Sequence, residues 1–182
     1  MAFRELTARV HLCIAEIQLF PKSILAVING TATGGGFSLA LNWEFRPMTE
    51  TAHLKQALTS QRLCLDVGGT WFLQRLFGLR RALEIVALDV WISAKQALNW
   101  ELVNRVGLPE KFTAETPSWA SRLAEHSNHT FTTVKQLLNE SRNSQLETQL
   151  EHERQGRVRT IENFDDQEGL SASLQKRSPS FA

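Results

Sequence analysis

Hydrophobic residues recur at helical spacing near the start of the chain. One apolar face is formed by residues three or four positions apart: Phe3, Leu6, Val10, Ile14 and Ile17. Pro21 follows this pattern, and a helix ends where proline removes an N–H group and fixes the backbone. The next apolar run, residues 24–28, is short and rich in β-branched residues. We therefore predict a helix followed by a strand that is buried on both faces.

Two glycine-containing breaks divide the following segment. The glycines at 34–36 precede a helical pattern at residues 37–41, and a second break at residues 65–70 precedes helical stretches over 71–77 and from 79 onward. Ser93 is the residue type that caps a helix start, which predicts a helix over 94–100. A further strand is expected at residues 102–106.

The pattern changes from Pro109 onward, where four helical segments have polar outer faces. We expect them at residues 117–126, 131–141, 144–163 and 166–176. The third has a possible apolar seam formed by Leu146, Leu150, Val158 and Ile161. The chain is thus predicted to consist of an α/β portion at residues 1–108, then a helical portion at residues 109–182 that ends in a loose tail.

Composition excludes several classes of protein. The 182 residues carry 20 Lys and Arg against 19 Asp and Glu, so a basic nucleic-acid module is disfavoured. Two cysteines without a partner motif make neither a zinc site nor a disulfide framework. No apolar run reaches the ~18–20 residues of a membrane span, and the N-terminus lacks a signal-peptide pattern. We expect a cytoplasmic protein without a metal, a membrane anchor or a nucleic-acid partner.

The triple glycine at 34–36 is the first candidate for chemistry. Successive glycines let the backbone approach a ligand, and the free N–H groups of the following helix start favour an anion or an enolate oxygen. The spacing matches neither a Walker A loop nor a dinucleotide-binding loop. A tight turn between strand and helix explains the same residues, and spacing alone leaves both interpretations open.

Asp66 beside Gly68 and Gly69 is the second candidate. Flanking apolar residues would exclude water from its carboxyl group, which would raise the pKa toward a range useful for proton transfer. The alternative is that Asp66 caps the helix that begins near Gly69 or Thr70. Without further context, the cap is the more common role for such an aspartate.

Three segments together resemble the crotonase superfamily, the enoyl-CoA hydratase/isomerase family. PKSILAVINGTATGGGFSLALNWEFR is similar to the family's central strand, oxyanion loop and helix. LDVGGTWFLQRLFGLRRALEIVALDVWISAKQALNWELVNRV is similar to its catalytic turn and the ISA block. DDQEGLSASLQKRSPSF is similar to its terminal motif. The three matches keep the family's order and spacing and extend nearly from end to end.

The resemblance implies a spiral of ββα turns with a helical C-terminal trimerisation region, in homotrimers or hexamers. It also implies an acyl-CoA thioester as ligand, with coenzyme A as part of the substrate and no separate cofactor. Carried over by position, Gly35 supplies an oxyanion N–H, Gly34 and Gly36 shape the loop, and Lys176 meets the ligand.

Two positions depart from the family's hydratases, which carry a pair of water-activating glutamates. These glutamates fall on Ser38 and Leu58, and neither residue is an acid or base. Asp66 falls where several isomerases of the family place a working aspartate. The resemblance therefore favours Asp66 as the acid/base of a double-bond isomerisation over simple hydration or a helix cap.

The family also has an N-terminal segment that corresponds to nothing in this sequence. It supplies the first strands, the second oxyanion N–H and much of the coenzyme A surface. We expect the strand at 24–28 to need a neighbour from that segment or from another chain. The alternative to an enzyme is a non-catalytic assembly subunit or a truncated inactive family member.

Overall fold

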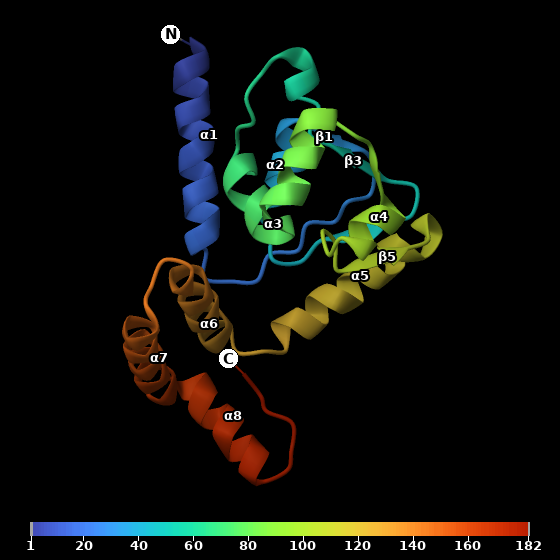
Figure 1. The fold of residues 1–182 in the computed structure, drawn as a ribbon. Helices are drawn as coiled ribbons and strands as arrows, with labels where there is room; N and C mark the ends of the chain where they lie inside the picture. Colours follow the sequence, from blue (N-terminus) through green and yellow to red (C-terminus); the bar gives the residue numbers. More distant parts are fainter. Residues whose placement is uncertain (1, 182) are drawn as a thin grey trace. The chain divides into compact units, whose positions relative to one another are not determined.

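A computed structural model describes residues 2–181 and divides them into two compact units (Figure 1). The first unit comprises α1 up to Gln18 and residues 24–118, and the second comprises residues 19–23 and those from Trp119 onward. The units divide within α5, whereas the sequence placed the domain boundary before it. The helices are α1 (Ala2–Leu19), α2 (Gly35–Ala40), α3 (Gly69–Leu88), α4 (Ala94–Asn99), α5 (Pro109–Ala124), α6 (Asn128–Ser141), α7 (Leu146–Ile161) and α8 (Phe164–Leu174).

Short strands form two small sheets in the first unit. One sheet has the order β1-β3-β4, with β1 parallel to β3 and β4 antiparallel to it; the other pairs β2 with β5 in parallel. Parallel neighbours far apart in sequence need crossovers, which fits a spiral of strands and helices. The strands are β1 (Ala32–Thr33), β2 (Pro47–Thr49), β3 (His53–Lys55), β4 (Ile92–Ser93) and β5 (Arg105–Gly107).

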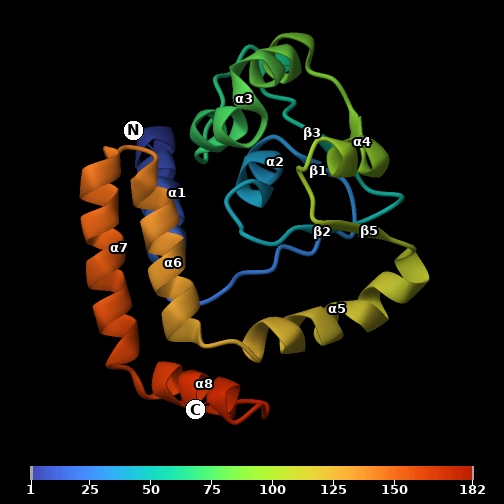
Figure 2. The same cartoon turned by 60° about the horizontal axis from the view of Figure 1, so that its bottom comes forward.

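The core of this unit joins α2, α3 and α4 to the strands. Its buried apolar side chains include Phe37, Met48, Leu54, Leu73, Ile85, Ile92, Ala97 and Leu102. Burial of such side chains is the main stabilising contribution. In Figure 2, α2 lies among the strands and loops of this unit. The glycine loop is therefore attached to the most buried part of the unit.

Several local predictions are confirmed. The helix at the start of the chain is α1, and Ser93 caps α4, with its hydroxyl accepting a bond from the Gln96 amide at 3.3 Å. The two expected helical stretches from residue 71 onward form one element, α3, interrupted at Gly78, whose φ is 73° and ψ is 161°. Glycine tolerates that backbone conformation, so the break follows from the residue type.

The strand expected at residues 24–28 is only half formed. Ala26 and Ile28 donate to the carbonyls of Phe45 and Pro47 at 2.8 and 2.9 Å, which pairs one edge. The backbone groups of Leu25 and Val27 make no hydrogen bond within residues 2–181, and Val27 is 40% exposed. The prediction of burial on both faces is wrong, because Val27 is exposed whereas Ile28 is buried. No strand within residues 2–181 pairs with the second edge of the segment.

In the second unit, α6 and α7 lie side by side (Figure 2). Gly156 of α7 meets α6 closely: a Cβ there would lie 3.0 Å from Leu137 and 3.2 Å from Thr133. The predicted apolar seam of α7 does not make this contact, since its four members are 46–68% exposed. The small Gly156 and the buried Gln149 face α6, so the apolar seam points outward.

The strand expected at 102–106 begins later, at Arg105. Leu102 and Val103 are buried in the turn after α4, where both amides donate to the Ala97 carbonyl. The turn is secured by Arg46, whose Nε donates to the Leu102 carbonyl at 2.6 Å. Across residues 2–181, no helix is long and apolar enough to cross a membrane.

Candidate functional site

The glycine loop begins at Gly34, where the backbone has a φ of 55°. Its amide donates to the Lys55 carbonyl at 3.1 Å, which ties the loop to β3. A Cβ at Gly34 would lie 3.7 Å from Leu58, so there is space for one but the positive φ favours glycine. The loop is thus held by its backbone rather than by side chains.

Helix α2 starts at Gly35 with free amide groups. No acceptor among residues 2–181 takes a hydrogen bond from the amides of Gly35 and Gly36, and Gly34 provides no side-chain cap. Gly36 lines a hollow of about 250 Å³ together with residues of the half-paired segment, including Val27 and Asn29. These amides are available to a ligand oxygen.

Asp66 lies at the turn that starts α3. Gly68 is the cap residue of this helix, and no side chain makes a cap hydrogen bond there. Asp66 contributes only its backbone carbonyl, which accepts from the Gly69 amide at 2.8 Å. The alternative role of Asp66 as a side-chain helix cap is therefore wrong.

The carboxyl group of Asp66 has an oxygen without a partner. Its Oδ1 is shielded from solvent and accepts no hydrogen bond from any residue in the described range 2–181. Buried polar atoms are nearly always satisfied, so an exception calls for an explanation such as a missing ligand or a catalytic role. Among the described residues, Ser38 Oγ and Asn42 Oδ1 beside this turn are likewise buried without a hydrogen-bond partner.

Packing joins the Asp66 turn to the glycine loop. A Cβ at Gly35 would lie 3.7 Å from Val67, and the Asn42 amide group bridges the carbonyls of Ser38 and Val67 at 2.8 and 3.0 Å. Asp66 directly precedes Val67, and the Cα atoms of neighbouring residues are ~3.8 Å apart. The backbone of Asp66 is therefore one residue away from the contact between Val67 and Gly35. The two candidate groups therefore belong to segments of the first unit that pack against each other.

The Asp66 side chain lines a different hollow from Gly36, on the side of α1. This hollow has a volume of about 490 Å³. Its walls come from α1 and the beginning of α3, and they are largely apolar. They include His11, Ile14, Ala15, Gln18, Leu65, Gly68, Thr70, Trp71 and Phe72.

Ser38 and Leu58 offer no carboxylate at this site. Ser38 is fully buried, its Oγ has no hydrogen-bond partner among residues 2–181, and a Cβ at Gly69 would come within 2.5 Å of that Oγ. Leu58 faces Gly34. The space around Ser38 leaves no room for a glutamate side chain without displacing the α3 turn.

Asp89 fixes the loop that carries Leu58. Its Oδ1 accepts from the Ala57 amide at 2.7 Å, and its Oδ2 lies 3.5 Å from Lys55 Nζ. Burial raises the pKa of Asp89, but hydrogen bonds from Ser60 and Ala57 and the charge of Lys55 lower it more, so the pKa lies below its ordinary value. An ionised Asp89 therefore anchors this wall of the site.

Comparison with known proteins shows the family. The family model described as enoyl-CoA hydratase/isomerase matches residues 5–182. The chain belongs to the enoyl-CoA hydratase/isomerase family. It is 32% identical to 1,2-epoxyphenylacetyl-CoA isomerase of Escherichia coli, over 92% of this chain and 64% of that protein. It is also 32% identical to a probable enoyl-CoA hydratase of Bacillus subtilis, over 97% of this chain and 69% of that protein.

Solved structures of the family confirm the predicted crotonase-like α/β fold. An enoyl-CoA hydratase from Bacillus anthracis matches with a TM-score of 0.92 and 29% identity, over 99% of this chain and 70% of that one. The chain spans 64% of the length of the E. coli isomerase. Within residues 2–181, no group of three or more His, Cys, Asp and Glu side chains is placed to hold a metal ion.

Lys176 belongs to the second unit. It is exposed, lies just after α8 with a φ of 54°, and its amide donates to Ser173 at 3.2 Å. The first unit holds Gly34, Gly35, Gly36 and Asp66. The role of Lys176 toward a family ligand therefore stays a prediction.

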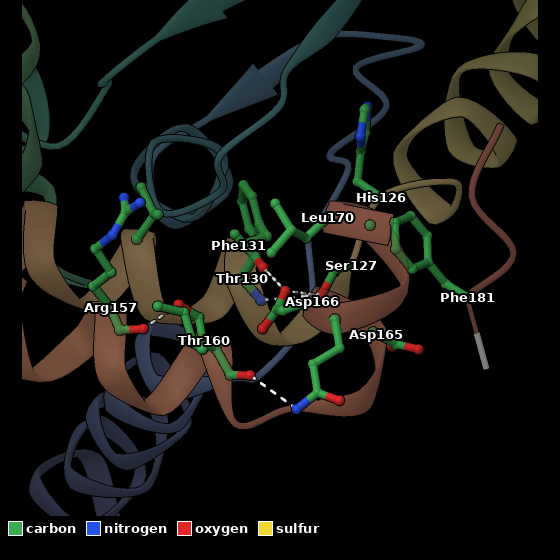
Figure 3. A pocket seen from close by; sticks show the side chains of 14 residues that line it. His126, Ser127, Thr130, Phe131, Arg157, Thr160, Asp165, Asp166, Leu170 and Phe181 are labelled. Atoms are coloured by element: carbon green, nitrogen blue, oxygen red, sulfur yellow. Dashed lines mark hydrogen bonds between the residues drawn. The ribbon is translucent and has the colours of Figure 1, made fainter. Parts of the chain in front are cut away.

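A polar cluster in the second unit was not foreseen from the sequence. The Asp166 carboxylate at the start of α8 accepts hydrogen bonds from Ser127 Oγ at 3.1 Å and from Thr130 Oγ1 (Figure 3). It also lies 3.0 Å from His129 Nδ1. Burial raises the pKa of Asp166, but hydrogen bonds from Thr130, His129 and Ser127 outweigh it and keep the pKa below its ordinary value. The cluster connects α8 to the start of α6. The sequence did not predict it, because Asp166 is far along the chain from Ser127, His129 and Thr130.

Proposed function

We propose that this chain binds an acyl-CoA thioester and shifts a carbon–carbon double bond within the acyl group. The observation that carries the proposal is the buried, unpartnered Oδ1 of Asp66, one residue from the contact between Val67 and Gly35. A carboxylate oxygen with no internal partner, in a turn that packs through Val67 against the start of α2, suits a substrate that supplies both an acidic proton and an oxyanion.

The amide N–H of Gly35 would donate a hydrogen bond to the thioester oxygen as negative charge develops on that oxygen. One such donor contributes about 2.7–4 kcal/mol to the stabilisation of an oxyanion in characterised enzymes. With the carbonyl polarised, Asp66 takes a proton from the carbon next to it, and the bonding electron pair enters the enolate. A proton is then added two carbons further along, which moves the double bond.

Isomerisation fits these residues better than hydration. Hydration needs a group that activates water, and the two positions where the resemblance places glutamates hold the buried Ser38 and the apolar Leu58. One of the relatives is named as an isomerase, of 1,2-epoxyphenylacetyl-CoA. An Asp66-dependent proton transfer needs no activated water.

The test is turnover of a 3-enoyl-CoA into its conjugated 2-enoyl isomer, followed by absorbance. Asp66→Asn keeps the shape of the side chain and removes the base, so we expect a loss of about 10²–10⁴-fold in kcat. Glu50→Gln, at an exposed carboxylate that lines none of the hollows described above, is the matched control and should keep the wild-type rate. Equal rates in the wild type and Asp66→Asn would reject this role.

Binding without turnover is the second candidate function. The absence of a carboxylate at Ser38 and Leu58 favours it, because those positions would supply catalytic groups in a hydratase. Calorimetry with butyryl-CoA and a 3-enoyl-CoA separates the candidates. Micromolar binding without any isomerisation would support the second candidate. If the protein shows no binding and no turnover, the assembly role expected from the sequence is the alternative that remains.

We also propose self-association through the second unit, as a trimer or a pair of trimers. Its support is the outward apolar seam of α7, where Leu146 is 68% and Leu150 54% exposed. Large exposed apolar surfaces on helices are typical of interfaces.

A further inference from the structure

The hollow that Asp66 lines contains a second titratable side chain. His11 is the only other acid or base among its lining residues in the described part of the chain. The two groups approach from different elements, Asp66 from the turn before α3 and His11 from α1. A substrate in this hollow would therefore lie between two groups able to exchange protons.

The position of His11 follows from the helix that carries it. His11, Ile14, Ala15 and Gln18 are three to four residues apart, so they share one face of α1. Ile14 is the one buried residue of α1, and the Gln18 amide group donates to the Asn42 carbonyl at 2.7 Å, which anchors this face to the first unit. His11 lies one turn before Ile14 on the same face, so the anchored part of α1 directs it toward the hollow.

His11 is also free to act. Its ring makes no hydrogen bond or ion pair within residues 2–181, and it is open to solvent. The remaining side chains of the hollow are apolar, aromatic or neutral, with Ile14, Leu65, Trp71 and Phe72 available to contact the carbon chain of an acyl group. Among the described side chains that line this hollow, His11 is the one besides Asp66 that can deliver a proton.

We infer that His11 delivers the second proton of the isomerisation, so that the reaction uses two groups rather than Asp66 alone; this rests on the proposed function. The Asp66 carboxylate breaks the C–H bond next to the thioester and keeps the proton, while the electron pair enters the dienolate. The His11 imidazolium gives its proton to the carbon two positions further along, where the dienolate pair forms the new C–H bond. Asp66 then loses its proton to water, and His11 takes one from water.

The test follows solvent deuterium into the product. The full chain converts 3-hexenoyl-CoA in D₂O, and the 2-enoyl product is analysed by mass spectrometry at low conversion. Because His11 exchanges with solvent, we expect close to one deuterium per product molecule from the wild type. His11→Gln should lower kcat by at least about tenfold and should lose most of that deuterium, since any remaining turnover returns the substrate's own proton through Asp66.

The matched control is His53→Gln, which alters an exposed histidine of the same unit that lines none of the hollows described above. It should keep both the rate and the deuterium content. A wild-type product without deuterium would overturn the inference, as would a His11→Gln variant whose deuterium content is unchanged, whatever its rate.

The two proposals fail separately. Turnover that depends on Asp66 but is indifferent to His11→Gln would keep the proposed isomerase and reject the second proton carrier. An absence of turnover in the wild type would reject the isomerase and this inference with it.

Discussion

At the scale of single residues, the site depends on the close approach of Gly69 to Ser38. The helix α3 begins directly against the buried face of α2, and a Cβ at Gly69 would lie 2.5 Å from Ser38 Oγ and 3.3 Å from Ser38 Cβ. Only a residue without a Cβ fits there without a shift. The same contact keeps Asp66, three residues earlier, next to the glycine loop.

We predict that Gly69→Ala destabilises the protein by about 1–3 kcal/mol, because the added methyl group forces the α3 turn away from Ser38. Denaturant unfolding measures this loss. Ser38→Gly in the same chain should recover part of the stability, since it removes the opposing Cβ and Oγ.

Gly30→Ala is the control, because a Cβ at Gly30 would meet no atom within 4 Å. Its unfolding free energy should stay close to that of the wild type. Equal stability of Gly69→Ala and Gly30→Ala would contradict the close approach.

At the scale of elements, side-chain hydrogen bonds join the starts of α6 and α8. The start of α6 has Ser127 as its cap, and the same hydroxyl donates to Asp166 at the start of α8. Asp166 is held ionised by these contacts, with a pKa below its ordinary value. The hydrogen bonds between α6 and α8 described here thus all involve the Asp166 carboxylate.

We predict that this contribution to stability changes with pH in one direction. A carboxylate whose pKa is lower in the folded state than the ordinary 3.8 stabilises the fold above that value, and the contribution disappears as the pH falls through the lowered pKa. Thermal unfolding of the wild type and Asp166→Asn should therefore differ most near pH 7. The two Tm values should converge as the pH falls through the lowered pKa of Asp166. A difference that stays unchanged from neutral pH down to the acid limit of folding would contradict this account.

The spacing of apolar residues identified most helices, but it did not show which face of each helix packs against a neighbour. The spacing of apolar residues located α1 and the helices of the second unit, because a helical face is a local property of the sequence. The outward direction of the α7 seam was missed, because the close contact depends on Gly156 and its partner Leu137 in another helix.

The candidate site was predictable only in part. The glycines and Asp66 were identified from motifs, whereas His11 is 55 positions away from Asp66 in the sequence and showed no spacing typical of a site. Only the fold brings α1 and the α3 turn to one hollow. The unpartnered Oδ1 of Asp66 likewise depends on what three-dimensional packing leaves unsatisfied.

At the scale of the whole molecule, several large apolar side chains are exposed to solvent. On α7 it is formed by the seam residues, and on α1 by Phe3, which is 73% exposed, and Leu6, which is 58% exposed. Such surface is costly in water and is usually covered by a partner. The proposed self-association would cover the part on α7.

We predict that the chain sediments as an oligomer and that Leu146→Glu combined with Leu150→Glu shifts it to smaller species. Charges at these positions would have to be buried without partners in an interface, which opposes association. Sedimentation velocity measures the shift, and circular dichroism should show unchanged helix content. Leu138→Glu, at an exposed leucine of α6 outside the seam, is the control. A wild-type monomer at micromolar concentration would contradict the proposal.

The central claim is that the amides at the start of α2 hold the carbonyl group of a bound acyl-CoA thioester. Infrared difference spectroscopy of butyryl-CoA labelled with ¹³C at the carbonyl tests it without requiring turnover. The account predicts that binding moves the carbonyl stretch to lower frequency, because hydrogen bonds from the amides draw electron density to the oxygen, and that Asp66→Asn keeps the shift. A bound ligand whose carbonyl frequency equals that of free butyryl-CoA would contradict the account.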